Sequence, residues 1–283
     1  MIISSLWLAR AKYTGKPEAL LIFSPSRTVG HMRLTSRTAE IANTLYDAAL
    51  ALLYPQACAI CGRSVDERRN GVACEACWRR TRVFNGGETI CWKCGAFSAG
   101  IVSEESREDV RCRRCERESF TASRACGAYE GALRAMVLEL KRSPHLPKRL
   151  ALLLREAQGR APLHEATRIV PVPLHAERLR ERGFNQAAAL GLALASLSGL
   201  PLDEESLVRT THTERHRAGM DARARRESVA GAFDVARPRL ISGERILLID
   251  DVLTTGATVS ASADALLAAG AREVFVLTVA RPV

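Results

Sequence analysis

Near its carboxyl end the 283-residue chain reads Ile246-Leu247-Leu248-Ile249-Asp250-Asp251-Val252-Leu253-Thr254-Thr255-Gly256-Ala257-Thr258. Four consecutive branched apolar residues predict a strand buried on both faces, as in the parallel sheet of an α/β domain. Two carboxylates, Asp250 and Asp251, stand at the carboxyl end of that strand. A small, hydroxyl-rich loop follows them, and an Ala/Leu segment with helical spacing then predicts a helix over 257–269.

The loop and the acid pair together favour a sugar phosphate as the ligand. Unpaired N–H groups at a helix start suit a phosphate, and Gly256 lets that phosphate approach the backbone closely. The acid pair suits hydroxyl groups or a hydrated cation, so a five-carbon sugar with a 5′-phosphate carries both features. An ATPase is excluded because the only Gly-Lys pair, Gly15-Lys16, is followed by Pro17. A purely structural turn gives no reason for two adjacent like charges.

The nine cysteines form the second strong pattern. Eight of them make four C-x-x-C pairs, and Cys126 stands alone. Gaps of 12 and 17 residues between successive pairs fit two four-thiolate zinc sites, whereas a two-residue gap strains a structural disulfide. We expect two structural Zn²⁺ sites on these ligands: Cys58, Cys61, Cys74, Cys77, Cys91, Cys94, Cys112 and Cys115. Consecutive pairing is the simpler arrangement, and interleaved pairing stays open.

Composition sets the class of protein and its partners. A hydrophobic content of 47% in 283 residues is enough for one sizeable core. The formal charge of +10 favours polyanionic partners, and arginines near Trp78 and Trp92 favour a nucleic-acid contact. No apolar run is long enough for a membrane span, and the start lacks the pattern of a signal peptide, so a cytoplasmic location is expected.

Three parts are expected along the chain. Residues 1–43 read as a disordered tail, 44–120 as a helix plus a double zinc ribbon, and 124–283 as one α/β domain. The first helix is expected from about Ser36 to Leu53. Within the α/β domain, further helices are predicted over 132–142 and 147–158, with another ending near Ser198. A short strand over 168–174 ends in a rigid Pro171-Val172-Pro173 loop.

Several of these motifs carry a resemblance to known families. The thirteen-residue run is similar to the 5-phosphoribosyl-1-pyrophosphate (PRPP) motif of type I phosphoribosyltransferases. Together with Ile169–Leu174, Arg182-Gly183-Phe184-Asn185-Gln186 and the four C-x-x-C pairs, it resembles the ComF family of competence-associated, GntX-like proteins. The resemblance covers about residues 45–283. It implies a type I phosphoribosyltransferase fold, a mostly parallel sheet flanked by helices, preceded by a small zinc-ribbon module.

The resemblance also implies roles for individual residues. Asp250 and Asp251 would be the catalytic acids on the ribose hydroxyls, which requires the chain to turn already at Asp251. A flexible lid is expected over 209–226. His216 within it and Ser228 just after it depart from the family pattern. The expected substrate-binding residues are Thr254, Thr255, Gly256, Ala257 and Thr258 for the 5′-phosphate, and Pro171, Val172, Pro173, Arg182 and Arg225 for pyrophosphate with its Mg²⁺.

Two functions from different classes follow. The first is a phosphoribosyltransferase acting at C1 of PRPP, or on another sugar phosphate, in DNA uptake and natural transformation. The second is a non-catalytic protein with the same fold that handles single-stranded DNA or has a regulatory role. Its partner would be the DNA-uptake machinery. The intact acid pair favours retained ligand binding, whereas the zinc module and the arginine clusters favour the second. Arg178 and Arg182 could converge on one anion or form a solvated basic face.

Overall fold

The computed structural model describes residues 56–65, 67–98, 102–211, 224 and 227–283. Contacts divide the chain into two compact units, 1–42 and 43–283, and every described residue belongs to the second unit. The tail predicted over 1–43 and the helix predicted over 36–53 lie outside the described residues.

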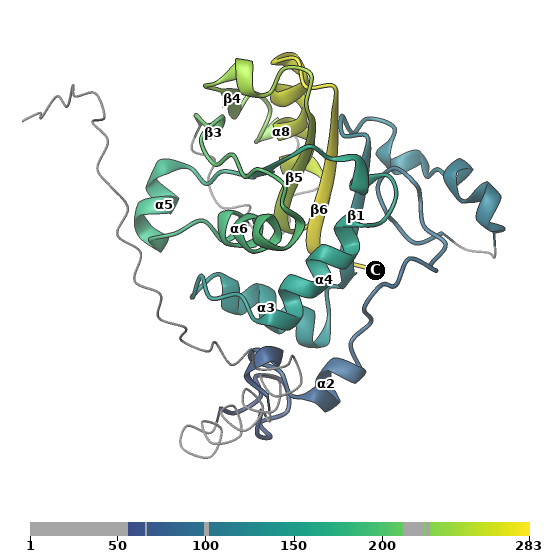
Figure 1. Cartoon of the computed structure of the whole chain (residues 1–283), viewed down its shortest axis with the longest axis vertical. Coiled ribbons are helices and arrows are strands. Elements are labelled where there is room, and N and C mark those ends of the chain that lie inside the picture. Colours follow the sequence, from purple (N-terminus) through teal and green to yellow (C-terminus); the bar gives the residue numbers. More distant parts are fainter. Residues whose placement is uncertain (1–55, 66, 99–101, 212–223, 225–226) are drawn as a thin grey trace, which may run out of the picture. The chain divides into compact units, whose positions relative to one another are not determined.

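A four-stranded parallel sheet forms the centre of the α/β domain, in the order β1-β6-β5-β2 (Figure 1). In the inner strand β5, Ile249 lies opposite Pro171 of β2 on one side and Leu277 of β6 on the other. The run Ile246–Ile249 is fully buried, as expected for a strand covered on both faces. The strands are β1 (Ala122–Ala128), β2 (Arg168–Pro171), β5 (Arg245–Val252) and β6 (Glu273–Arg281).

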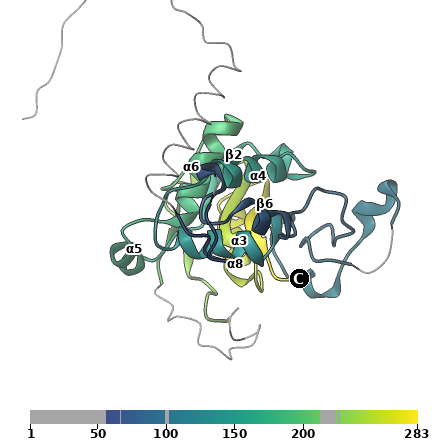
Figure 2. The same cartoon turned by 90° about the horizontal axis from the view of Figure 1, so that it is seen from below.

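Alternate residues of β5 face two different hydrophobic cores. Leu247 and Ile249 join the first core, which includes side chains of α3, α4 and α6. Ile246 and Leu248 join the second core, together with α8. Figure 2 shows α4 and α6 on one side of β6 and α8 on the other. The helices are α3 (Gly131–Leu140), α4 (Lys148–Gln158), α5 (Ala176–Arg182), α6 (Gln186–Ser198) and α8 (Ala257–Ala268).

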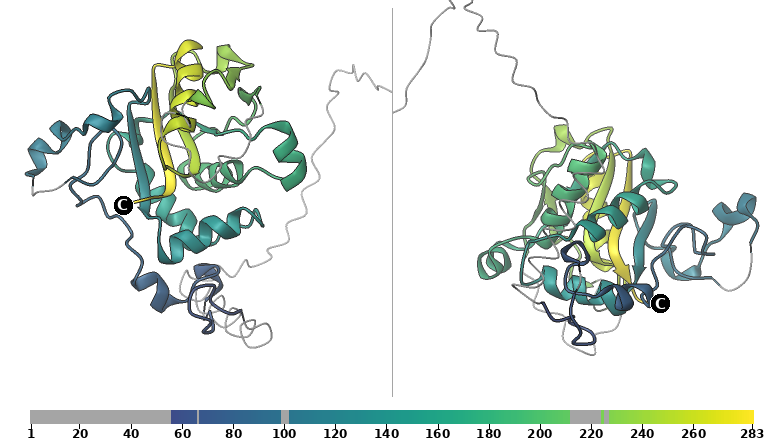
Figure 3. Two further views of the ribbon diagram at one scale, coloured as in Figure 1. Left: turned by 180° about the vertical axis from the view of Figure 1, so that it is seen from behind. Right: turned by 60° about the horizontal axis from the view of Figure 1, so that its bottom comes forward.

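Two cysteine-rich ribbons precede the sheet along the chain and lie in different places (Figure 3). Each of them joins a different core. Cys58 and Trp78 belong to the first core, whereas Cys91 and Phe120 belong to the second. Among their described residues the ribbons form short elements: η1 (Arg68–Asn70), α2 (Glu75–Arg79), η2 (Glu104–Asp109) and η3 (Arg113–Cys115). The predicted fold class, a mostly parallel sheet flanked by helices behind a cysteine-rich module, is confirmed.

A small antiparallel pair lies beside α8 in the second core. Leu207 of β3 (Leu207–Arg209) pairs with Val235 of β4 (Phe233–Val235). The remaining short elements are η4 (Leu163–Glu165) and η5 (Pro238–Leu240). The lid predicted over 209–226 therefore starts at the end of β3 and returns just before β4. Most of it, residues 212–223 and 225–226, lies outside the described residues. In the part of the chain that the structure describes, no helix combines the length and apolarity needed to cross a bilayer.

Candidate functional site

The acid pair lies at the carboxyl end of β5, but on a strand that does not turn there. β5 continues through Val252, which pairs with Ala280 of β6. The prediction of a turn at Asp251 is therefore wrong, because the ladder with β6 holds this segment extended. Consecutive side chains of a strand alternate in direction. Asp251 accordingly meets Lys141 at the end of α3, with 3.5 Å between Nζ and Oδ2.

Asp250 has an unusual charge environment. Loss of hydration raises the pKa of its carboxyl to about 8, and the neighbouring charge of Asp251 adds to the effect. Three features lower the pKa in part: the N–H of Asp251, which donates to Asp250 Oδ1 at 2.8 Å, and the charges of Lys141 and Arg209. The pair thus carries a carboxylate that is costly to ionise without a ligand. Such a group is typical of a functional site.

Substituting Asp250→Asn is expected to stabilise the folded chain in a pH-dependent way. Between about pH 4 and pH 8 the native state holds a proton on Asp250 that the unfolded chain releases, so the wild type loses stability as pH rises. Asparagine never ionises, and its oxygen still accepts the Asp251 N–H. The gain should be small at pH 4, on the order of 4 kcal/mol at pH 7, and level off above pH 8. Urea unfolding across this range measures it, and a gain independent of pH would contradict it.

The predicted phosphate loop follows directly, between β5 and α8. Leu253 is tied to β6 by its N–H, which donates to Ala280 O at 3.1 Å. Gly256 is the N-cap of α8 with φ +83°, and no side chain caps the helix. Its positive φ favours glycine, and a Cβ there would lie 3.0 Å from Oε2 of buried Glu118. The first N–H groups of α8 are consequently left for another acceptor.

The proline loop lies beside the acid pair because β2 and β5 are neighbours. Val172 donates its N–H to Ile249 O at 3.0 Å, one residue before Asp250. Asn185 fixes the loop from outside: its Nδ2 donates to Val172 O at 3.0 Å, and its Oδ1 caps α6 at the N–H of Ala187. Arg182 donates to Gln186 Oε1 at this corner. Part of the run Arg182–Gln186 thus has a structural role, because Asn185 holds the loop.

The carboxyl edge of the sheet therefore brings most predicted ligand-binding residues together. The acid pair, the loop Thr254–Thr258 and the loop Pro171–Pro173 lie at the ends of the neighbouring strands β5 and β2. Ligands of α/β sheets bind at this edge. Arg225 lies outside the described residues. The charges of Lys141 and Arg209 also influence the acid pair, because both lower the pKa of Asp250 and Lys141 pairs with Asp251. The local sequence around these two basic residues does not predict this role.

The eight cysteines gather as two consecutive tetrads, which settles the pairing left open above. In each tetrad the four Sγ atoms lie within 4.8 Å of one another. Measured pairs range from 3.5 Å for Cys91–Cys115 to 3.8 Å for Cys58–Cys77. Four sulfurs about 2.3 Å from a tetrahedral Zn²⁺ would lie about 3.8 Å apart, so both tetrads fit zinc. With four thiolates each, they leave no open position, as structural zinc sites do. Cys126 is buried elsewhere, and burial raises its pKa to about 12.

The second tetrad and the phosphate loop line one cavity of about 320 Å³. Cys94, Cys112 and Cys115 line it together with Thr254, Thr255 and Gly256. Ser119, just after the tetrad, donates its N–H to Ser260 Oγ of α8 at 2.9 Å. The second ribbon is therefore built against the predicted phosphate site.

Comparisons with known proteins agree with both parts of the chain. A double zinc ribbon family model matches residues 49–116. The DNA utilization protein YhgH of Salmonella typhi is 33% identical over 242 residues, covering 82% of this chain and 93% of that protein. Competence protein F of Haemophilus influenzae is 28% identical over 233 residues, covering 79% and 96%. A solved glutamine PRPP amidotransferase from B. subtilis superposes on 50% of this chain and 30% of its own, with TM-score 0.34 and 18% identity.

Proposed function

Since the chain belongs to the family of DNA utilization protein YhgH and competence protein F, we propose that it binds a 5-phosphoribosyl compound and acts in DNA uptake. One observation carries the first half of the proposal. An acid pair and an uncapped helix start follow one another at the carboxyl edge of the central strand. A ribose 5-phosphate presents hydroxyls and a phosphate that match these two features.

In this proposal, each group of residues at the carboxyl edge of the sheet binds one chemical group of the ligand. Asp250 accepts hydrogen bonds from the ribose hydroxyls, and Asp251, on the other face of the strand, contributes its negative charge. The N–H groups at the start of α8 hold the 5′-phosphate. The Pro171–Pro173 loop faces the pyrophosphate of PRPP. Magnesium enters as part of the substrate, because it is held largely by phosphate oxygens and water and neutralises their charge. Lys141 keeps the carboxylate of Asp251 oriented while the site is empty.

Transfer at C1 of the sugar is the reaction that such a site supports. The bond between C1 and the pyrophosphate oxygen breaks, and its electron pair leaves with pyrophosphate. The positive charge left on the sugar ring is stabilised by the fixed electrostatics of the site. A lone pair of the acceptor then forms the new bond to C1.

A panel of three small ligands tests whether the acids meet the sugar. We expect ribose 5-phosphate to bind the zinc-loaded chain about tenfold more tightly than 2-deoxyribose 5-phosphate, because a hydrogen bond to a carboxylate contributes about 1.5–3 kcal/mol. Inorganic phosphate, which reaches only the helix start, should bind more weakly than either sugar. Calorimetric titration measures all three affinities. Equal affinity for the two sugars would show that the acid pair does not recognise the hydroxyls.

The DNA half of the proposal rests on the relatives and on the second ribbon. Two relatives carry names for DNA utilization and competence. The second ribbon exposes Arg111, Arg113 and Arg117 around its last cysteine pair. Exposed arginines of this density suit the phosphates of a nucleic acid. The family resemblance implies handling of single-stranded DNA, so single-stranded DNA is the proposed polymer.

A further inference from the structure

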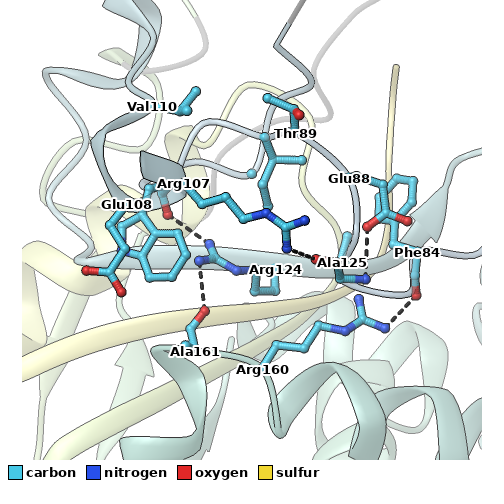
Figure 4. Close-up of a pocket in the computed structure, with 14 residues that line it drawn as sticks. Phe84, Glu88, Thr89, Arg107, Glu108, Val110, Arg124, Ala125, Arg160 and Ala161 are labelled. Atoms are coloured by element: carbon cyan, nitrogen blue, oxygen red, sulfur yellow. Dashed lines mark hydrogen bonds between the residues drawn. The ribbon is translucent and has the colours of Figure 1, made fainter. Parts of the chain in front are cut away.

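A second cavity, of about 330 Å³, lies away from the acid pair and the phosphate loop (Figure 4). Its walls come from the second ribbon, from β1 and from the turn after α4, and no residue of the sugar-phosphate site lines it. The volume is in the range of pockets for small ligands. Nothing in the proposed transfer reaction uses this cavity.

Three guanidinium groups converge on the cavity, those of Arg107, Arg124 and Arg160 (Figure 4). Arg124 is only 5% exposed, and its amino groups donate to Trp92 O and Ala161 O, each at 2.8 Å. Burial lowers its pKa to about 10, so it stays charged at neutral pH. Such fixed cations make the cavity a site for an anionic group.

One hydrogen-bond donor of Arg160, its Nε, is left without a partner among the described residues. Its Nη2 bonds to Phe84 O and, at 2.8 Å, to Glu156 Oε1. Its Nε is buried and has no hydrogen-bond partner among the described residues. Two carboxylates, those of Glu88 and Glu108, line the same cavity. The oxygens of Glu88 are already used, because they accept the N–H groups of Asn85 and Gly86, both at 2.9 Å. An incoming acceptor would satisfy the buried Nε of Arg160.

Aromatic and apolar side chains form the rest of the wall. The guanidinium of Arg124 stacks over the Trp92 ring, 4.6 Å from its centroid. Phe84 is 5% exposed and meets Phe97 edge to face, with ring centroids 5.0 Å apart. Flat apolar surfaces beside guanidinium groups suit a planar, polar ring, because bases stack on aromatic side chains and on arginine planes.

We propose that this cavity holds one nucleotide, with its base against the Trp92 and Phe84 wall and its phosphate toward Arg107 and Arg160. The proposal rests on the DNA half of the proposed function and gives it a site. The nucleotide belongs to a single strand, since a base stacked in a duplex cannot enter a pocket. Exposed Arg111, whose charge acts on Arg124, continues the positive surface outside the cavity for the neighbouring phosphates.

The test measures binding of the zinc-loaded full chain to a labelled single-stranded thymidine oligonucleotide and to free thymidine monophosphate. Arg107→Gln/Arg160→Gln removes two cations from the cavity, and Arg239→Gln/Arg272→Gln is the matched control, with the same loss of charge at exposed positions that do not line it. We expect the cavity variant to bind the strand at least about tenfold more weakly and the control to change it little more than twofold. Zinc content and thermal unfolding are recorded for both.

A crosslink on the unmutated chain gives an answer that does not depend on any variant folding. An oligonucleotide carrying 5-iododeoxyuridine should attach to the peptide that contains Trp92. Strand binding with equal affinity in the cavity and control variants, or a crosslink only elsewhere, overturns the proposal and leaves DNA handling intact. Binding of the monophosphate alone supports a nucleotide site but overturns its link to DNA. If neither the strand nor the monophosphate binds, the nucleotide site and the DNA half of the proposed function are both overturned, whatever the sugar-phosphate panel shows.

Discussion

Replacing Asp250 and Asp251 together by asparagine is expected to abolish detectable binding of PRPP while the chain stays folded. Carboxylates accept charge-assisted hydrogen bonds from hydroxyls, each contributing about 1.5–3 kcal/mol, whereas a side-chain amide offers a weaker acceptor. Losing two such interactions costs about 3–6 kcal/mol, which is a loss of affinity of more than about a hundredfold. Calorimetric titration in the presence of Mg²⁺ measures the change.

The control for this experiment separates recognition from net charge and from misfolding. Asp109→Asn/Asp234→Asn removes the same two charges at exposed positions and should bind PRPP as the wild type does. The acid-pair variant should unfold at a temperature no lower than the wild type near pH 7, because Asp250 is destabilising while its pKa is about 8. Retained PRPP affinity in a folded acid-pair variant would remove these residues from the site.

Removing zinc from either tetrad is expected to destabilise the whole α/β domain rather than the ribbon alone. Cys58 and Trp78 are part of one hydrophobic core, and Cys91 and Phe120 are part of the other. Arg149 also ties the first ribbon to α4, with its Nη1 2.5 Å from Glu75 Oε2 and its guanidinium 4.5 Å from the Trp78 centroid. Structural zinc supplies folding free energy directly, so its loss exposes these contacts.

The expected size of the zinc effect is large. Loss of about 5 kcal/mol, well below the binding free energy of a structural zinc, lowers the melting temperature of a domain of this size by roughly 10–20 °C. Cys112→Ser should retain one zinc per chain and show this drop in calorimetry. Cys126→Ser, which changes the cysteine outside both tetrads, should keep two. Two retained zinc ions in Cys112→Ser, or an unchanged melting temperature after chelation, would contradict the assignment.

Local patterns predicted those parts of the chain whose structure is decided locally. The apolar run Ile246–Ile249 became the inner strand, and the Ala/Leu segment after Gly256 became α8. The C-x-x-C spacing predicted two metal sites, because a knuckle is a short-range structure. The pairing between knuckles depends on how the chain folds back, and only the three-dimensional arrangement shows it to be consecutive.

Features of the structure that local sequence patterns do not predict arise from pairing between distant strands. β1 reads Ala-Ser-Arg-Ala-Cys-Gly-Ala, a mostly small series without a strand pattern. It is extended because it pairs with β6, about 150 residues later. Pairing with β6 likewise holds Asp251 extended, against the predicted turn. Lys141 and Arg209 reach the acid pair from α3 and β3, and no spacing in the sequence links them to it.

Amide hydrogen exchange, measured with and without PRPP and Mg²⁺, tests the proposed binding site of the 5′-phosphate most directly. The amides at the start of α8 have no side-chain cap, so they should exchange rapidly in the free chain. Bound phosphate oxygens would accept from them, and we predict that exchange slows in peptides covering 254–260. Ribose 5-phosphate should give the same protection at higher concentration. Unchanged exchange over 254–260 throughout a titration to millimolar PRPP would contradict a sugar-phosphate site at this edge of the sheet.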